Sequence, residues 1–532
     1  MIYLDTMTKE KRNKKILTLI SIIASVSVYI GAVLVYLYAN GWRIDPFNQQ
    51  VIKTGVLTVE SDPFLASLFI EGESRGRTPR STSLHVGEYN ISVRRDGYLE
   101  WQKRVEIKEE KSTNVYPWLI RERIEKQNLS TIEGRKYLQS WESENSDRIL
   151  ILTSKLNEET TLFDFELWLY IVNTTFWDLS SNPKVVLSFQ SAQEPTIDLL
   201  SSPAGVYWLL KYTQDSISTS YLLDTSKSTT LENLVVLNTS PFDSYEISWA
   251  RNNQYLMFES DQDLISFSID RQNRYLLIKK TADNQYIWNT DEQGYFYILE
   301  SALENETERV YAYVLTQQEM DGSNPKVLVS DLFFQKNKDY LTRYIEDTTP
   351  FRFTAFTNST ASTRSVGKVE HIRVNQSAQG IYIQTSVASY WYNMKTKRYH
   401  MITPFKSEFV SFAPDNSKLI YKDENEYSIF TFLKEESNPN VEIGAKRIDN
   451  LSLSNGKILG WLSNSSYIYF VEDNRLYIAD KDGDNKTLIL SSVDTNLHLG
   501  MTSSRDYLFT ISILVNPVDG QEIISIDRYL VH

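Results

Sequence analysis

The chain has 532 residues, no cysteine, and a formal charge of −13 from 55 basic and 68 acidic residues. The lack of cysteine excludes disulfides, zinc–thiolate sites and thiol catalysis, and the acidic balance argues against nucleic-acid binding. Aromatic residues make up 13% of the chain, which favours sheets over helices, and a chain of this length is expected to form two or three domains.

The N-terminal region predicts a membrane anchor. Residues 1–15 hold five Lys/Arg against two acids, and 16–38 are 23 residues without a charge. A helix over 16–38 would span roughly 35 Å, enough for a bilayer core of about 30 Å. Because the basic tail precedes the apolar run, the positive-inside rule predicts a cytoplasmic N-terminus. We therefore expect a single-pass protein of the cell membrane, contacting lipid through 16–38, with a linker at 39–53 and extracytoplasmic C-terminal domains.

A cleaved signal peptide is the alternative interpretation of the same segment. The apolar cores of signal peptides run about 7–15 residues before a small-residue cleavage site. Here the run is longer and continues into Tyr38-Ala-Asn-Gly-Trp42. The sequence therefore favours an anchor that is retained.

Residues 54–120 predict a small β-sandwich. Leu57 and Val59 alternate with polar neighbours, as do Leu68 and Ile70, and period-two alternation between turn signals indicates half-buried strands. The motifs Gly55-x-Leu57-x-Val59-x-Ser61-x-Pro63, Ala66-x-Leu68-x-Ile70-x-Gly72, Gly76-x-Thr78-Pro79, Leu84-x-x-Gly87-x-Tyr89 and Gly97-Tyr98 resemble a PEGA domain. The resemblance implies a sandwich found in envelope and surface proteins, without known catalytic residues.

Five arginines in this region allow two interpretations. They could form a patch for an anionic polymer or for lipid headgroups, or they could be an ordinary solvated face. The balance of acids and bases in the domain favours the solvated face. The arginines are Arg75, Arg77, Arg80, Arg94 and Arg95.

Residues 121–532 contain a recurrent unit that predicts a β-propeller. In the clearest copy, an opening at 458–461 is followed by strands at 467–471, 476–479 and 487–490. Four antiparallel strands in about 35 residues make one blade. Counting this copy, eight such openings occur. They are Ser140-Trp141, Leu200-Ser-Ser-Pro203, Ile247-Ser-Trp-Ala250, Tyr286-Ile-Trp288, Val374-Asn375, Val410-Ser-Phe-Ala413, Ile458-Leu-Gly-Trp461 and Gly500-Met501.

These repeats predict seven or eight blades, with a strand from 121–137 completing the last blade. Ser-Asn-Pro recurs at 181–183, 323–325 and 437–439, and each copy should form the turn between the third and fourth strands. The openings at 249 and 412, with Asp-Gly-x-Asn turns at 321 and 482, are similar to the propeller repeats of TolB-like proteins. That resemblance implies an architecture and no particular activity.

Residues 331–368 are expected to form an insertion outside the blades. Phe333, Tyr340, Leu341, Tyr344 and Ile345 have helical spacing, which predicts a short amphipathic helix, although the polar Asn337 interrupts it. The insertion is either a cap that contacts a partner or a surface loop without such a role, and the loop is favoured.

Catalytic and metal-binding motifs are not found. His85, His371, His400, His498 and His532 make no HxxxH or HxH pair, and no nucleophile elbow, P-loop or dinucleotide motif occurs. The run from Asp480 to Asp484 superficially resembles a calcium loop, but its spacing favours a hairpin turn. We therefore assign no catalytic residue, no metal ligand and no cofactor, and we do not expect an enzyme.

The sequence thus predicts an all-β protein with one transmembrane helix, a PEGA-like sandwich and a propeller. The leading hypothesis is a surface-displayed binding or scaffold protein of the bacterial cell envelope. Its propeller would contact envelope protein or polysaccharide. The alternatives are an extracellular carbohydrate-active hydrolase using paired propeller carboxylates, and a structural surface-layer component.

Overall fold

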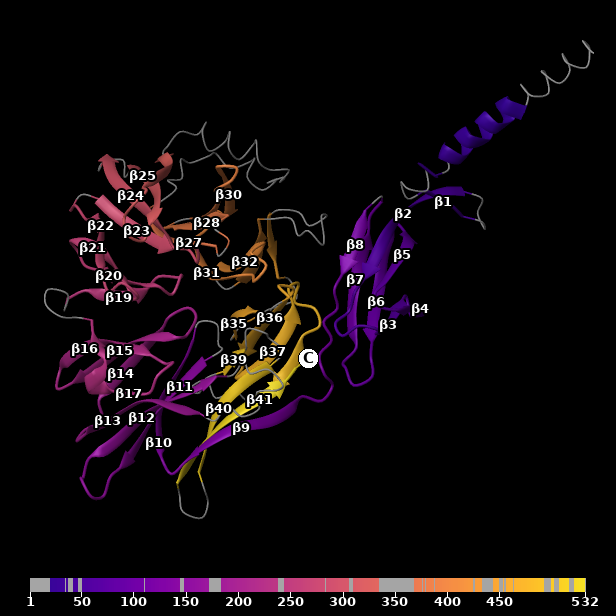
Figure 1. Ribbon diagram of the computed structural model, residues 1–532. Coiled ribbons are helices and arrows are strands. Elements are labelled where there is room, and N and C mark those ends of the chain that lie inside the picture. The colour runs from indigo at the N-terminus through magenta and orange to yellow at the C-terminus, as the bar shows by residue number, and fades with distance from the viewer. Residues whose placement is uncertain are drawn as a thin grey trace, which may run out of the picture. The chain divides into compact units, whose positions relative to one another are not determined.

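The computed structural model divides the chain into two compact units, Met1–Arg123 and Ile124–Leu433 with Ile443–His532. Each unit is described by itself (Figure 1). The residues that the structure describes are 20–33, 35–36, 42–45, 50–109, 111–143, 148–171, 183–237, 244–282, 284–305, 310–333, 368–375, 377, 379–386, 388–423, 426–432, 444–448, 453, 456–462, 464–491, 499–501, 507–515 and 521–531.

Residues 20–33 and 35–36 are helical. Within the described ranges, no helix has both the length and the apolar character needed to cross a bilayer. The predicted anchor, 16–38, begins and ends outside these ranges, so it stays a prediction.

Unit 1 contains a sandwich of two four-stranded sheets. One sheet has the order β1-β2-β5, with β8 also pairing with β2, and the other has the order β4-β3-β6-β7. The strands are β1 (Trp42–Asp45), β2 (Gln50–Val59), β3 (Ser67–Ile70), β4 (Glu73–Arg77), β5 (Arg80–His85), β6 (Gly87–Arg94), β7 (Trp101–Ile107) and β8 (Ser112–Val115).

The alternation in the sequence produces the core of this sandwich. Leu57, Val59, Leu68, Ile91 and Val93 are almost completely buried, and they come from both sheets. Their polar neighbours on the same strands point outward, as expected for a sheet with one buried face. The predicted small β-sandwich is therefore confirmed.

Unit 2 consists of consecutive antiparallel sheets. Its strands are β9 (Glu125–Glu133), β10 (Lys136–Glu142), β11 (Arg148–Leu156), β12 (Phe163–Ile171), β13 (Lys184–Ser191), β14 (Thr196–Ser201), β15 (Tyr207–Gln214), β16 (Ile217–Asp224), β17 (Thr229–Thr230), β18 (Val235–Val236), β19 (Glu246–Trp249), β20 (Tyr255–Glu259), β21 (Asp263–Ser268), β22 (Arg274–Lys279), β23 (Asn284–Thr290), β24 (Tyr295–Asn305), β25 (Val310–Glu319), β26 (Lys326–Phe333), β27 (Val369–Val374), β28 (Gly380–Thr385), β29 (Ser389–Asn393), β30 (Arg398–Thr403), β31 (Ser407–Phe412), β32 (Lys418–Asp423), β33 (Glu426–Thr431), β34 (Gly444–Arg447), β35 (Gly456–Trp461), β36 (Tyr467–Glu472), β37 (Arg475–Asp480), β38 (Thr487–Leu490), β39 (Leu499–Met501), β40 (Tyr507–Val515) and β41 (Glu522–Leu530), with a 3₁₀ turn at Leu231–Asn233.

The described residues of unit 2 form eight sheets in chain order. The first strands of these sheets are β10, β14, β19, β23, β27, β31, β35 and β39. Each of the eight predicted openings lies on, or at the end of, one of these first strands. Aromatic and small residues recur there because neighbouring first strands approach one another, as β23 approaches β27 and β31 approaches β35.

The hydrophobic cores lie between consecutive sheets. One cluster joins Trp141 and Leu150 of the first sheet to Trp208 of the second, and similar clusters join the third sheet to the fourth and the sixth to the seventh. A further cluster joins Ile149 of the first sheet to Ile524 of the eighth. Because the eighth sheet packs on the first, the arrangement is a propeller-like ring.

The ring is closed by a strand from the beginning of unit 2. β9 pairs antiparallel with β41, with Glu133 opposite Ile523 and Glu125 opposite Leu530. Three strands of the eighth sheet therefore come from the C-terminal end and the fourth from the N-terminal end. This confirms the prediction that 121–137 completes the last sheet.

β26 overlaps the start of the insertion predicted from about residue 331. It continues to Phe333, which pairs with Ala312 of β25, so Phe333 belongs to a strand and not to the predicted helix. Two register shifts between β25 and β26 each place one extra residue on β26, as β-bulges do. Residues 334–367, including the predicted helix, lie outside the described residues.

The two Asp-Gly-x-Asn turns have the same backbone. Gly322 and Asn324 have φ of +80° and +52°, and Gly483 and Asn485 have φ of +84° and +54°. Glycine and asparagine tolerate these left-handed conformations best. Both turns connect the third strand of a sheet to the fourth.

Candidate functional site

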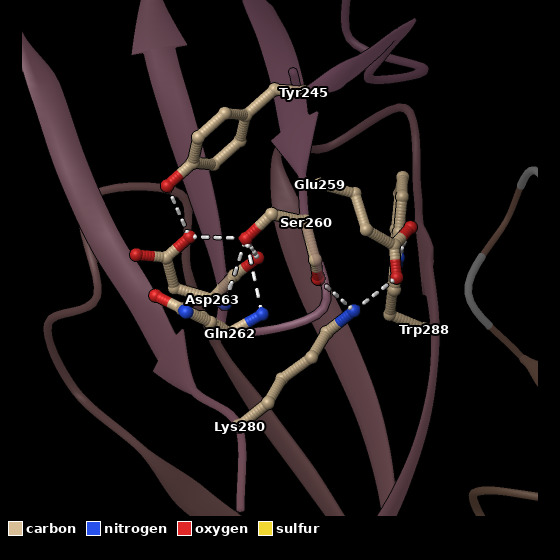
Figure 2. Close-up of polar contacts among 7 residues, drawn as sticks. All are labelled: Tyr245, Glu259, Ser260, Gln262, Asp263, Lys280 and Trp288. Atoms are coloured by element: carbon tan, nitrogen blue, oxygen red, sulfur yellow. Dashed lines mark hydrogen bonds and ion pairs between the residues drawn. The ribbon is translucent and has the colours of Figure 1, made fainter. Parts of the chain in front are cut away.

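A polar cluster lies at one end of the third sheet, beside the first strand of the fourth (Figure 2). The turn between β20 and β21 supplies Ser260 and Gln262, and the strand ends supply the charged groups. We call this group the Glu259 cluster, and its members are Tyr245, Glu259, Ser260, Gln262, Asp263, Lys280 and Trp288.

Glu259 connects the two sheets. Its Oε1 lies 2.7 Å from Nζ of Lys280, and its Oε2 accepts a hydrogen bond of 2.8 Å from Nε1 of Trp288 on β23. Nζ of Lys280 also donates to the backbone oxygen of Ser260 at 2.7 Å. The Lys280 side chain is 15% exposed and the Glu259 side chain 32% exposed, so this ion pair is partly screened and still reachable from solvent.

The second half of the cluster is built around Asp263. Its Oδ1 accepts from the Tyr245 hydroxyl at 2.6 Å and from Oγ of Ser260 at 2.8 Å. Oγ of Ser260 in turn accepts from the backbone N–H of Asp263, a local turn that explains why serine follows the strand here. The hydrogen bond to the Asp263 carboxylate, followed by burial, raises the pKa of Tyr245.

The carboxylate of Glu300 lies near β23, the strand that carries Trp288. Oε1 of Glu300 accepts from Nδ2 of Asn284 at 2.7 Å and from the Tyr286 hydroxyl at 3.2 Å. Tyr286 and Trp288 are two residues apart on β23, so they share a face, and both pack toward the third sheet. The site therefore combines the partly exposed rings of Tyr286 and Trp288 with one lysine and the carboxylates of Glu259, Asp263 and Glu300.

This arrangement favours hydrogen-bonded recognition over nucleophilic chemistry. Ser260 has a carboxylate beside it but no histidine or lysine positioned as its base, so the Ser–base–carboxylate order of an acyl-transfer site is not built here. Aromatic rings beside carboxylate, amide and ammonium groups can contact a polar ligand through both ring faces and hydrogen bonds.

The residues considered from sequence as metal ligands are not brought together. Among the residues that the structure describes, no group of three His, Asp or Glu side chains could hold a metal ion. His85 and His371 are exposed on separate units. Oδ1 of Asp480 accepts backbone N–H groups of Asp482 and Asp484, both at 3.0 Å, so the calcium-like run is the hairpin turn predicted.

A buried carboxylate elsewhere in unit 2 accepts hydrogen bonds from other groups of the protein. Asp291 has an exposed fraction of 0%, and it accepts from the Tyr297 hydroxyl at 2.9 Å and from the Tyr295 backbone N–H at 2.8 Å. Burial, together with the Asp291 carboxylate, raises the pKa of Tyr297. These contacts fix the loop between β23 and β24 and are structural.

Sequence reasoning found Trp288 and Tyr286 but missed their partners. Both aromatics were part of a repeat opening, whereas Glu259 is the last residue of β20 and Lys280 directly follows β22, with no motif of their own. The signal available in the sequence was their position. Charged residues where the second and fourth strands of one sheet end lie at the same end of that sheet, because neighbouring strands run antiparallel.

Comparisons with solved structures find distant similarity. The chain is similar to an oligogalacturonate lyase from Vibrio parahaemolyticus, with 9% identity, a TM-score of 0.37, and coverage of 74% of this chain and 98% of the other. It is also similar to dipeptidyl peptidase 4 of Porphyromonas gingivalis, with 12% identity, a TM-score of 0.43, and coverage of 73% and 57%. The propeller-like assignment rests on strand order and core clusters, not on these scores.

Sequence comparison is more specific for unit 1. No curated protein matches the chain. Residues 54–122 match the family model of the PEGA domain, in agreement with the resemblance seen in its motifs. The similarity to TolB-like repeats stays a prediction.

Proposed function

We propose that this protein is a membrane-anchored binding or scaffold protein displayed on the outside of a bacterial cell. Residues 16–38 would anchor it, and unit 2, as an eight-bladed propeller, would contact envelope protein or polysaccharide. The observation that carries the proposal is the Glu259 cluster, where aromatic and polar side chains remain partly exposed on a ring closed by β9 and β41.

The charge pattern supports the location. The basic tail and the uncharged run lie in the order that retains the N-terminus in the cytoplasm. The chain contains no cysteine, so a single cysteine in unit 2 gives a clean topology test. Ile217→Cys, at a site 71% exposed on β16, should react with an impermeant maleimide on intact cells. Reaction only after lysis would overturn the orientation.

The ligand-binding part is tested with purified full-length chain on immobilised envelope polysaccharides and envelope proteins. Binding should fall at least severalfold in Lys280→Met and in Trp288→Phe. Lys227→Met is the matched control, because Lys227 is also paired with a carboxylate, that of Asp224, but is 79% exposed and is not a member of the cluster. Equal binding by all three variants would show that the Glu259 cluster does not contribute to ligand binding.

A hydrolase is the second candidate, because Glu259 and Glu300 contact neighbouring positions on one face of β23. Glycosidases use two carboxylates roughly 5–10 Å apart, and Glu259 and Glu300 are the pair that this face of β23 offers. Turnover of chromogenic glycosides that is lost in both Glu259→Gln and Glu300→Gln would favour this function. Turnover unaffected by either change would reject this pair.

A further inference from the structure

The loop between β2 and β3 in unit 1 exposes two adjacent large apolar side chains. Phe64 is 66% exposed and Leu65 is 63% exposed. Leu65 also has φ of +63°, a left-handed conformation that is costly for a bulky residue. Exposed apolar pairs held in an unfavourable conformation point to an interaction.

The backbone of this loop is bonded within the domain. The N–H of Leu65 donates to the Thr78 oxygen at 3.1 Å, the N–H of Ala66 donates to Oγ1 of Thr78 at 3.1 Å, and Oγ of Ser61 donates to the Pro63 oxygen at 2.8 Å. The Phe64 oxygen accepts from Arg95. Backbone groups that are bonded within the protein lose less on leaving water than unbonded ones, and this lowers the cost of moving the loop into an apolar medium.

Arginines flank the two apolar side chains. Arg95 bonds the loop directly, and its guanidinium also lies over the Tyr98 ring. Arg77 pairs in register with Ser67, two residues after Leu65, and it is exposed. Asp62 and Asp96 balance these two charges, so the two guanidinium groups themselves, and not a net positive charge of the loop, are what lipid phosphates would meet.

We propose that the loop 61–66 inserts Phe64 and Leu65 into the surface of a lipid bilayer, with Arg77 and Arg95 at the level of the phosphates. A projecting apolar pair suits a deformable bilayer, whereas a protein partner would need a matching cavity. Interfacial binding combines apolar insertion with basic residues in this way. The inference rests on the proposed membrane location and deepens it.

Insertion has a geometric consequence for the sandwich. The predicted anchor leads into β1, whose Trp42 lies opposite Lys53 of β2. From Lys53 to the end of β2 at Val59 is roughly 20 Å. A sandwich held by the anchor at one end and by the loop at the other would lie along the bilayer. An anchored domain without this contact would be free to stand away from it.

The test places an environment-sensitive dye at Phe64→Cys in the full-length chain, reconstituted in vesicles of phosphatidylcholine with or without phosphatidylglycerol. Quencher-bearing lipid chains should quench this dye, more strongly with the anionic lipid, and should leave a dye at Ile217→Cys unaffected. Adding Leu65→Asn should reduce the quenching. Asparagine tolerates positive φ, so this second variant keeps the loop conformation.

The outcomes separate the two proposals. Chain that does not float with the vesicles would contradict the anchor itself. Chain that floats while the Phe64→Cys dye stays open to a water-soluble quencher would overturn the insertion alone. A dye that is shielded from water yet unaffected by lipid quenchers would mean that protein covers the loop, which also overturns the proposal.

Discussion

Nζ of Lys126 on β9 lies 2.9 Å from Oδ2 of Asp527 on β41, joining the two ends of unit 2. The Asp527 side chain is only 1% exposed. It also accepts hydrogen bonds from Asn128 at 3.1 Å and from Ser525 and Ser512 at 3.0 Å each. A buried carboxylate with four donors fixes the register of the closing strand.

Asp527→Ala should destabilise unit 2 by about 2–4 kcal/mol, because it leaves a lysine and several buried donors without their acceptor. Urea unfolding of the full-length chain measures the change. Glu73→Ala, which removes an exposed pair with Arg75, should cost less than about 1 kcal/mol. Similar losses for both variants would show that the closing contact contributes little.

The stability of unit 2 should fall at acidic pH. Burial would raise the pKa of Asp527, but its hydrogen bonds, led by the one from Lys126, outweigh burial and hold the pKa below the usual value of an aspartate. A lowered folded-state pKa contributes stability that is present above the unfolded pKa and is lost as the pH falls through the folded pKa. The urea midpoint should therefore drop below about pH 4, and less steeply in Asp527→Asn, whose amide does not titrate.

Lys418 and Asp415 should respond unequally to mutation. Nζ of Lys418, whose side chain is 2% exposed, lies 2.9 Å from Oδ2 of Asp415, which is 37% exposed. Asp415→Ala leaves a buried ammonium beside Ser417 and Trp461, and should cost about 2–4 kcal/mol. Lys418→Met leaves a carboxylate that water can reach, and should cost less. The reverse order in thermal unfolding would contradict this account.

Gly380→Ala should destabilise the fifth sheet. A Cβ at this position would lie 2.1 Å from Cζ2 of Trp391, a buried ring stacked on Phe432 at 3.9 Å. Because the ring is enclosed, it cannot move aside freely, and overpacking of this kind costs about 1–3 kcal/mol. Near-ultraviolet circular dichroism during thermal unfolding would report both the loss and the displaced tryptophan. An unchanged spectrum and midpoint would mean that the ring can relocate.

Trp288→Phe should loosen the contact between the third and fourth sheets by about 1 kcal/mol, because Glu259 loses one neutral donor. Glu259 keeps Lys280 at 2.7 Å, so the loss should stay small. Hydrogen exchange of β20 and β23 measures the change locally. Faster exchange confined to other sheets would argue against this link.

The sequence by itself determined the strands and their order. Leu57 and Val59 alternate with polar residues, and turn residues such as Gly483 and Asn485 mark the hairpins, because burial on one face and left-handed turns are local requirements. The eight repeat openings were visible for the same reason. Each opening is a short segment of the first strand of its sheet. Trp461, for example, pairs with the second strand and packs in the core between two sheets.

Only the tertiary structure shows which side chains from separate segments contact one another. Asn128 meets Asp527 across 399 positions of chain, and Trp288 meets Glu259 across 29. Neither pairing follows from local periodicity, because a side chain's partner depends on which sheet end the fold brings beside it. The exposed Phe64–Leu65 pair is a similar case. The sequence predicted a turn there. Only the fold shows that Arg95 and Thr78 bond the backbone of this loop and that both side chains are exposed.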